Sequence, residues 1–135
     1  MKGILTAYLD KQIAYPLPDR YVHRPWRQSI TIASGNLPDW VLTLEGEVIS
    51  VGLQTIVEYR NSQILASLCR IMPSEDVIGI ESLRSSVGMS SPLHIILGWV
   101  EDEPPVLADL AMTRNWGTDA PVLSIVSATI EFREF

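Results

Sequence analysis

Short apolar segments, each ended by glycine, proline or charged residues, follow one another along this chain and constrain its fold most strongly. Residues 29–34 (SITIAS) show the pattern clearly, because the two isoleucines of this segment alternate with Ser29 and Thr31. Such alternation is typical of a β-strand with one buried and one exposed face. We therefore predict that strands make up most of the fold.

The other segments extend this prediction. We expect further strands at residues 3–10, 41–44, 47–53, 55–59, 93–100 and 122–132. Residues 64–72 fit either a strand or a short helix. Ser74 is placed to cap a helix whose apolar residues recur at helical spacing up to Gly88, and residues 106–113 form a second short helix. The predicted fold class is α+β, strand-rich, with one or two short helices.

The length of 135 residues predicts a single domain, residues 1–135. Residues 29–53 resemble residues 93–132, because in each a strand leads through a tryptophan to a second strand that begins Val-Leu-Thr or Val-Leu-Ser. The likeness has two explanations, which are chance similarity between strands or a pseudo-repeat. A pseudo-repeat would give two β-rich lobes that face each other across a central groove.

Charge and cysteine content restrict the partners. Sixteen acidic side chains against ten lysines and arginines give a net charge of −6. That charge repels long double-stranded nucleic acid, so we expect no such partner. The single cysteine, Cys69, excludes a disulfide framework and a thiolate zinc site, and we expect no metal and no cofactor. No secretory signal and no membrane-spanning stretch is apparent, so we expect a cytoplasmic protein with no membrane partner.

Two histidines are the candidate acid–base groups. His94 opens an apolar strand, where its imidazole could act as a general acid or base, or could be a core histidine bonded to a backbone carbonyl. His23 lies in the basic segment 20–27 (RYVHRPWR), just before the strand that begins at Ser29. Trp99 ends the His94 strand and is a candidate ligand contact.

The basic segment 20–27 is the candidate phosphate-binding element. Arg24 and Arg27 offer the planar, multi-donor recognition that phosphate oxygens favour, and Trp26 could stack on a base. The alternative is a solvated loop whose arginines meet the surplus acidic side chains elsewhere in the chain.

The order of these elements resembles that of the 2H phosphoesterase superfamily. The segment SITIA, the Val-Leu-rich strands, HIILG at 94–98, the acidic turn EDEPP at 101–105 and the long final strand carry the resemblance. Residues 91–110 (SPLHIILGWVEDEPPVLADL) are most similar to the second motif of the phosphodiesterase domain of fungal-type tRNA ligases. The superfamily also includes RNA 2′,5′ ligase-like proteins and 2′,3′-cyclic phosphodiesterases.

The resemblance implies two histidine-x-threonine/serine motifs facing a groove, in which two imidazoles divide the acid–base work and the hydroxyls hold the phosphate. This chain has half of each motif. Ser29 stands where the first histidine is expected, although Thr31 is present, and Ile96 stands where the second hydroxyl is expected, although His94 is present. The resemblance therefore implies a groove lined by Ser29, Thr31 and His94, and does not support two-histidine catalysis from these positions.

These observations are compatible with three functions. The first is a degenerate 2H-like domain that binds a small nucleotide, cyclic or linear, or an RNA phosphate end. Its ligand-binding residues would be Arg24, Arg27, Ser29, Thr31, His94 and Trp99. By analogy with phage-encoded anti-defence proteins, it would sequester a nucleotide signal in the host cytoplasm.

The second is an active, metal-independent cyclic-nucleotide phosphodiesterase with His23 and His94 as the catalytic pair. The third is a non-enzymatic structural module, a homo-oligomer in which an exposed last strand pairs edge to edge with a second copy.

Overall fold

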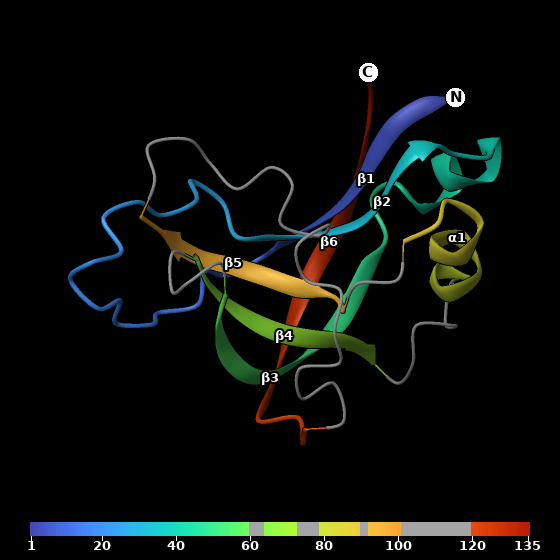
Figure 1. The fold of residues 1–135 in the computed structure, drawn as a ribbon. Coiled ribbons are helices and arrows are strands. Elements are labelled where there is room, and N and C mark those ends of the chain that lie inside the picture. Colours follow the sequence, from blue (N-terminus) through green and yellow to red (C-terminus); the bar gives the residue numbers. More distant parts are fainter. Residues whose placement is uncertain (60–63, 73–78, 90–91, 101–119) are drawn as a thin grey trace.

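The computed structural model of the protein describes residues 1–59, 64–72, 79–89, 92–100 and 120–135, and these contain six strands and two short helices (Figure 1). The strands are β1 (Lys2–Leu9), β2 (Ser29–Asn36), β3 (Val48–Tyr59), β4 (Ile64–Met72), β5 (His94–Trp99) and β6 (Ser124–Glu134). The helices are the 3-10 helix η1 (Asp39–Leu44) and the α-helix α1 (Ile80–Ser86). The predicted strand-rich α+β class is confirmed.

One antiparallel sheet contains all six strands, in the order β2–β1–β6–β3–β4–β5. Its two edge strands, β2 and β5, also approach each other, so the sheet is nearly closed. A division into two lobes around residues 29–53 and 93–132 is not confirmed. The two segments that suggested a repeat also differ in structure, because residues 41–44 lie in η1 whereas their counterpart runs into β6.

The last strand is central in the sheet. β6 pairs with β1 from Gly3↔Glu134 to Leu9↔Ala128, and with β3 from Val48↔Thr129 to Leu53↔Ser124. The expectation that this strand is exposed is therefore wrong, because β1 pairs with its second half and β3 with its first half. The two ends of the chain consequently lie side by side (Figure 1).

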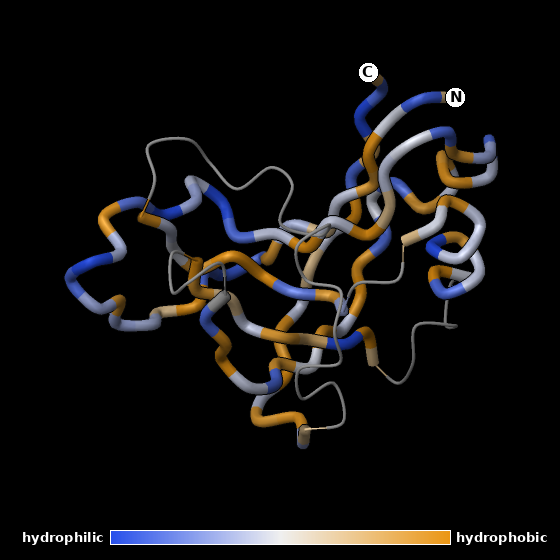
Figure 2. Tube along the Cα trace, viewed as in Figure 1, coloured by the Kyte–Doolittle hydropathy of each residue, from blue (hydrophilic) through white to orange (hydrophobic). Residues whose placement is uncertain are grey.

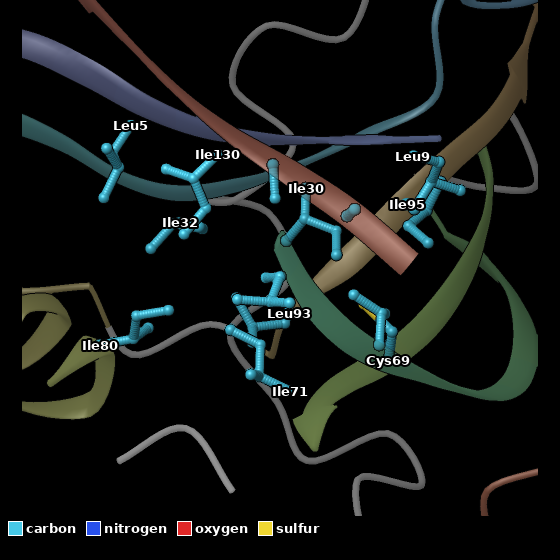
Figure 3. Close-up of a cluster of buried hydrophobic side chains, with 14 of the residues drawn as sticks. Leu5, Leu9, Ile30, Ile32, Cys69, Ile71, Ile80, Leu93, Ile95 and Ile130 are labelled. Atoms are coloured by element: carbon cyan, nitrogen blue, oxygen red, sulfur yellow. The ribbon is translucent and has the colours of Figure 1, made fainter. Parts of the chain in front are cut away.

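Apolar side chains from every strand meet inside the nearly closed sheet. The fully buried ones include Leu5 (β1), Ile30 (β2), Val51 (β3), Ile71 (β4), Ile95 (β5) and Ile130 (β6). Figure 3 shows most of them pointing toward a common centre, together with Ile80 from α1. The alternation found in the sequence thus places one face of each strand in the core.

A β-bulge in β2 is hydrogen-bonded by an arginine of the helix α1. The register between β1 and β2 shifts so that Leu5 lies opposite Ala33 but Thr6 lies opposite Thr31, which leaves Ile32 as the extra residue. A bulge of this kind leaves backbone groups without a ladder partner. The buried guanidinium of Arg84 donates to the carbonyls of Thr31 (3.3 Å) and Ile32 (2.7 Å), and so satisfies them from α1.

Several element boundaries differ from those expected. Residues 41–44 form part of η1 and not a strand, and the two strands expected at 47–53 and 55–59 are a single strand, β3, with a register shift between Leu53 and Ile56. Residues 64–72 form a strand. The expected helix start at Ser74, the acidic turn 101–105 and the helix at 106–113 lie outside the described residues.

The central position of β6 predicts a sharp contrast between two isoleucines of this strand, one buried and one exposed. Ile130→Ala should lower the free energy of unfolding by about 2–5 kcal/mol, because it empties a fully buried site. Ile125→Ala, at a residue that is 60% exposed, should change it by less than about 0.5 kcal/mol. Urea unfolding of both variants measures the difference, and equal effects would contradict the described orientation of β6.

Candidate ligand-binding site

Residues 11–28, which we call the strap, connect β1 to β2 and extend past the end of β5 (Figure 1). Figure 2 shows hydrophilic stretches along the strap, interrupted by short hydrophobic ones. Its two ends are held together by the buried side chain of Gln28, whose amide bonds to both backbone groups of Ile13. Tyr21 anchors its middle, because this side chain is only 4% exposed and packs in the core.

Three of the predicted ligand-binding residues share one surface. Arg27, Ser29 and Thr31 alternate along the chain, and Ser29 and Thr31 lie directly opposite Tyr8 and Thr6 of β1. Alternate residues of a strand point to the same face, and Ile30 and its neighbours fill the other face in the core. The outer face of β1 and β2 therefore presents one guanidinium and several hydroxyls together.

Arg27 is oriented by two contacts. Its guanidinium lies 4.1 Å from the centre of the Tyr8 ring, and its Nη1 is 3.4 Å from Oε2 of Glu131 on β6. The side chain is still 43% exposed, so this ion pair contributes little to stability and a stronger anion can compete for it. Arg27 is thus held in place while some of its donors face solvent.

Asp10 places a fixed negative charge beside Arg27. Its two carboxylate oxygens accept hydrogen bonds from the hydroxyls of Thr129 and Ser127, each at 2.7 Å. The bond from Thr129, then that from Ser127, and to a smaller extent the charge of Arg27 lower the pKa of the Asp10 carboxyl. Asp10 therefore stays ionised near neutral pH.

The strap exposes an aromatic residue next to this surface. Trp26 is 92% exposed and is flanked by the exposed Arg24 and Arg27. A tryptophan so open to water is unusual, because its large apolar surface is normally buried. Arg20, at the other end of the basic segment, stacks on Tyr21 and pairs with Glu58, so both Arg20 and Arg27 meet acidic side chains as the solvated-loop alternative expects.

His23 and Trp99 contact each other, but not at the Arg27 surface. The backbone of His23 pairs with that of Trp99 in an isolated bridge, with N–H···O distances of 3.2 and 3.1 Å. The two rings are stacked, with centroids 5.8 Å apart and an angle of 19° between their planes. Gly98 allows this close approach, because a Cβ there would lie 2.9 Å from Leu17 and 3.1 Å from the His23 carbonyl oxygen.

His94 lies at the opposite end of β5 from the His23–Trp99 pair. At about 3.3 Å per residue, the backbones of His94 and Trp99 are about 16 Å apart along the strand. The imidazole of His94 is buried, with only 6% of the residue exposed, and its Nδ1 is 2.9 Å from the carbonyl oxygen of Pro92. The structure therefore does not bring His23 and His94 together, and His94 presents almost no surface to water.

Four residues of this site carry no distinctive signal in the sequence: Tyr8, Asp10, Thr129 and Glu131. Each is polar and each occupies an outward position on a predicted strand or directly after one, which is the only hint that local patterns contain. Tyr8 and Asp10 approach Arg27 because β1 pairs with β2, and Thr129 and Glu131 because β6 lies beside β1. Local patterns contain neither pairing.

Among the described residues, no group of three or more histidine, cysteine, aspartate or glutamate side chains is arranged to hold a metal ion. No helix in that part of the chain has the length and apolar character needed to cross a membrane. Comparison of the chain with protein families, with curated proteins and with solved structures finds no match.

The hydrogen bonds to Asp10 predict a pH dependence of stability. Because the folded-state pKa lies below the ordinary value of 3.8, the ionised carboxylate stabilises the fold above that value, and this contribution is lost as the pH falls through the folded-state pKa. Thr129→Val should therefore raise the pKa of Asp10, which NMR titration of the carboxyl carbon measures. Thr43→Val, at an exposed threonine of η1, is the control and should leave the titration unchanged. An Asp10 pKa that does not rise in Thr129→Val would contradict this account.

Proposed function

We propose that the protein binds a small nucleotide, or an RNA end that bears a phosphate, on the surface formed by Trp26, Arg27, Ser29 and Thr31. The observation that carries the proposal is that Ser29 and Thr31 point outward at the start of β2, and that Arg27, in the strap just before this strand, lies over the Tyr8 ring on the same outer face. Trp26, the residue before Arg27, is 92% exposed. The guanidinium and the two hydroxyls are donors suited to phosphate oxygens, and Trp26 offers a face on which a base can stack.

The geometry favours binding over hydrolysis. Acid–base cleavage by two histidines needs both imidazoles within reach of one phosphate. His23 lies at the Trp99 end of β5 and His94 is buried at the other end, so their positions do not favour the phosphodiesterase alternative. Ser29 and Ile96, which replace one histidine and one hydroxyl of the 2H-like motifs, fit the same interpretation.

A binding protein of this size without catalysis would act by sequestration. In this proposal the protein lowers the free concentration of a nucleotide signal, as phage-encoded anti-defence proteins do, in the cytoplasm of the host cell. The two-lobed groove of a 2H-like domain is not required, because the proposed ligand lies on the outer face of β1 and β2 and not between two lobes.

Titration calorimetry with linear and cyclic nucleotides tests the proposal. Arg27→Ala should weaken binding by about tenfold or more, because it removes a charged hydrogen-bond donor to the phosphate. Arg20→Ala is the matched control, since Arg20 also stacks on a tyrosine and pairs with a glutamate on the same strap, and it should change the affinity by less than about twofold. Absence of heat with every nucleotide at millimolar concentration would refute the proposal.

The carboxylates beside Arg27 predict a preference for a phosphate group with a single charge. Asp10 and Glu131 repel the second charge that a phosphate monoester gains above its second pKa of about 6. At pH 7.5, 2′,3′-cyclic AMP should bind about fivefold more tightly than adenosine 3′-monophosphate, since one unit charge near a solvated carboxylate is worth about 1 kcal/mol.

Asp10→Asn should reduce this difference, because the variant removes one of the two repelling charges. The same calorimetric titrations at pH 7.5 and pH 5.5 provide the check, since the monoester loses its second charge at the lower pH. Tighter binding of the monoester at pH 7.5 would show that these carboxylates do not select the ligand.

A further inference from the structure

We propose that the stacked pair of His23 and Trp99 is a latch, which holds residues 22–27 of the strap, the part after the buried Tyr21, on β5 and opens locally while the sheet stays folded. His23 is then a positioning residue, in contrast to the acid–base role expected from the sequence. The latch deepens the proposed function, and its ligand-dependent part rests on it, because the strap also carries Trp26 and Arg27.

In addition to Tyr21, which is anchored in the core, the strap contacts β5 directly. This contact includes one isolated backbone bridge with two hydrogen bonds, the stacked rings, and the packing of Leu17 against Gly98. A neighbouring strand of the sheet, by contrast, is held by a continuous ladder such as the one between β1 and β6. A contact of this size can separate without disturbing the ladders that hold the sheet together.

The latch also contains a buried donor that lacks an acceptor. The indole Nε1 of Trp99 is buried, and in the described part of the chain it is the one buried side-chain nitrogen or oxygen that has no hydrogen-bond partner. A buried N–H without an acceptor destabilises the state that buries it. The docked latch therefore contains an unfavourable contribution that a satisfied N–H would not make.

The latch lies close to the residues that the proposed ligand would contact. Trp26 and Arg27 follow His23 by three and four residues. The strap is held again at Arg27, by Tyr8 and Glu131, and at Gln28, by its bonds to Ile13 and Gln12. Opening at His23 therefore changes where Trp26 points, while Ser29 and the sheet remain in place. A ligand that contacts Trp26 and Arg27 favours the docked strap, because it binds that state more tightly.

Amide hydrogen exchange measured by NMR without any ligand tests the latch. The Trp99 amide, which donates to the His23 carbonyl, should exchange faster than the amide of Ile130 at the centre of the sheet. His23→Ala removes the stacked ring and should accelerate exchange at Trp99 about tenfold with no change at Ile130. His23→Phe keeps an aromatic ring and should remain within about twofold of the wild type at both amides.

Each outcome separates the latch from a general loss of stability. An unchanged rate at Trp99 in His23→Ala, or equal acceleration at Trp99 and Ile130, would overturn the proposal. An equally fast rate in His23→Phe would show that the ring does not hold the strap, and would overturn it as well.

A second measurement with 2′,3′-cyclic AMP distinguishes the latch from the proposed function. Slower exchange at the Trp99 amide in the presence of this nucleotide supports both. If His23→Ala and His23→Phe give the expected exchange rates but the nucleotide neither binds nor slows exchange, the latch is supported and the proposed function is refuted. Hydrolysis of the nucleotide by the wild type that is lost in His23→Phe would show that the imidazole is catalytic, and would overturn its assignment as a positioning residue.

Discussion

The pairing of β6 between β1 and β3 is the interaction on which the rest of this structure depends. It joins the two ends of the chain and brings Ala128 and Ile130 into the core. On the outer face it sets Thr129 and Glu131 beside the residues of β1, where they orient Asp10 and Arg27. Without this strand neither the nearly closed sheet nor the polar surface above it would form.

The polar surface is a balance of opposite charges and not a simple basic patch. The Arg27 guanidinium lies over the Tyr8 ring and near two carboxylates. One of them, Asp10, accepts hydrogen bonds from two hydroxyls, which favour its ionised form. Under the proposed function, such a surface would select an anionic ligand by the amount of its charge, because the two carboxylates oppose the attraction of Arg27. This agrees with the overall net charge of −6, which disfavours large polyanions.

Strands with one buried and one exposed face were predictable from the sequence. The prediction was ambiguous for β4, which is buried on both faces. In β4, Leu65, Cys69 and Ile71 face the core, but Ile64 and its outward neighbours are also buried in a second cluster. Apolar residues therefore fill both faces, the alternation disappears, and a strand cannot be told from a buried helix. Residues 41–44 were assigned wrongly, since they were expected to be a strand but form part of the 3-10 helix η1.

The candidate site was predictable only along a single strand. Ser29 and Thr31 were recognised because their spacing puts them on one face of a strand, and Arg27 because it lies in the basic segment just before that strand. Asp10 was missed because its position beside Arg27 depends on the pairing of β1 with β2 across the strap. Glu131 was missed because its position depends on the register between strands more than a hundred residues apart in the chain. The contact of His23 with Trp99 is long-range in the same way, since local periodicity contains no information on which edge a connecting loop will follow.

The central place of the last strand has a consequence for biosynthesis. While the ribosome is still adding residues before Ser124, β1 and β3 each lack the neighbour that completes their hydrogen bonding. Five strands can then collapse but cannot assemble their final order, so the decisive step waits until β6 has been synthesised and joins residues that are far apart in the chain. During this interval two unpaired strand edges are open to other nascent chains, and the cell must keep such molecules apart until β6 is inserted.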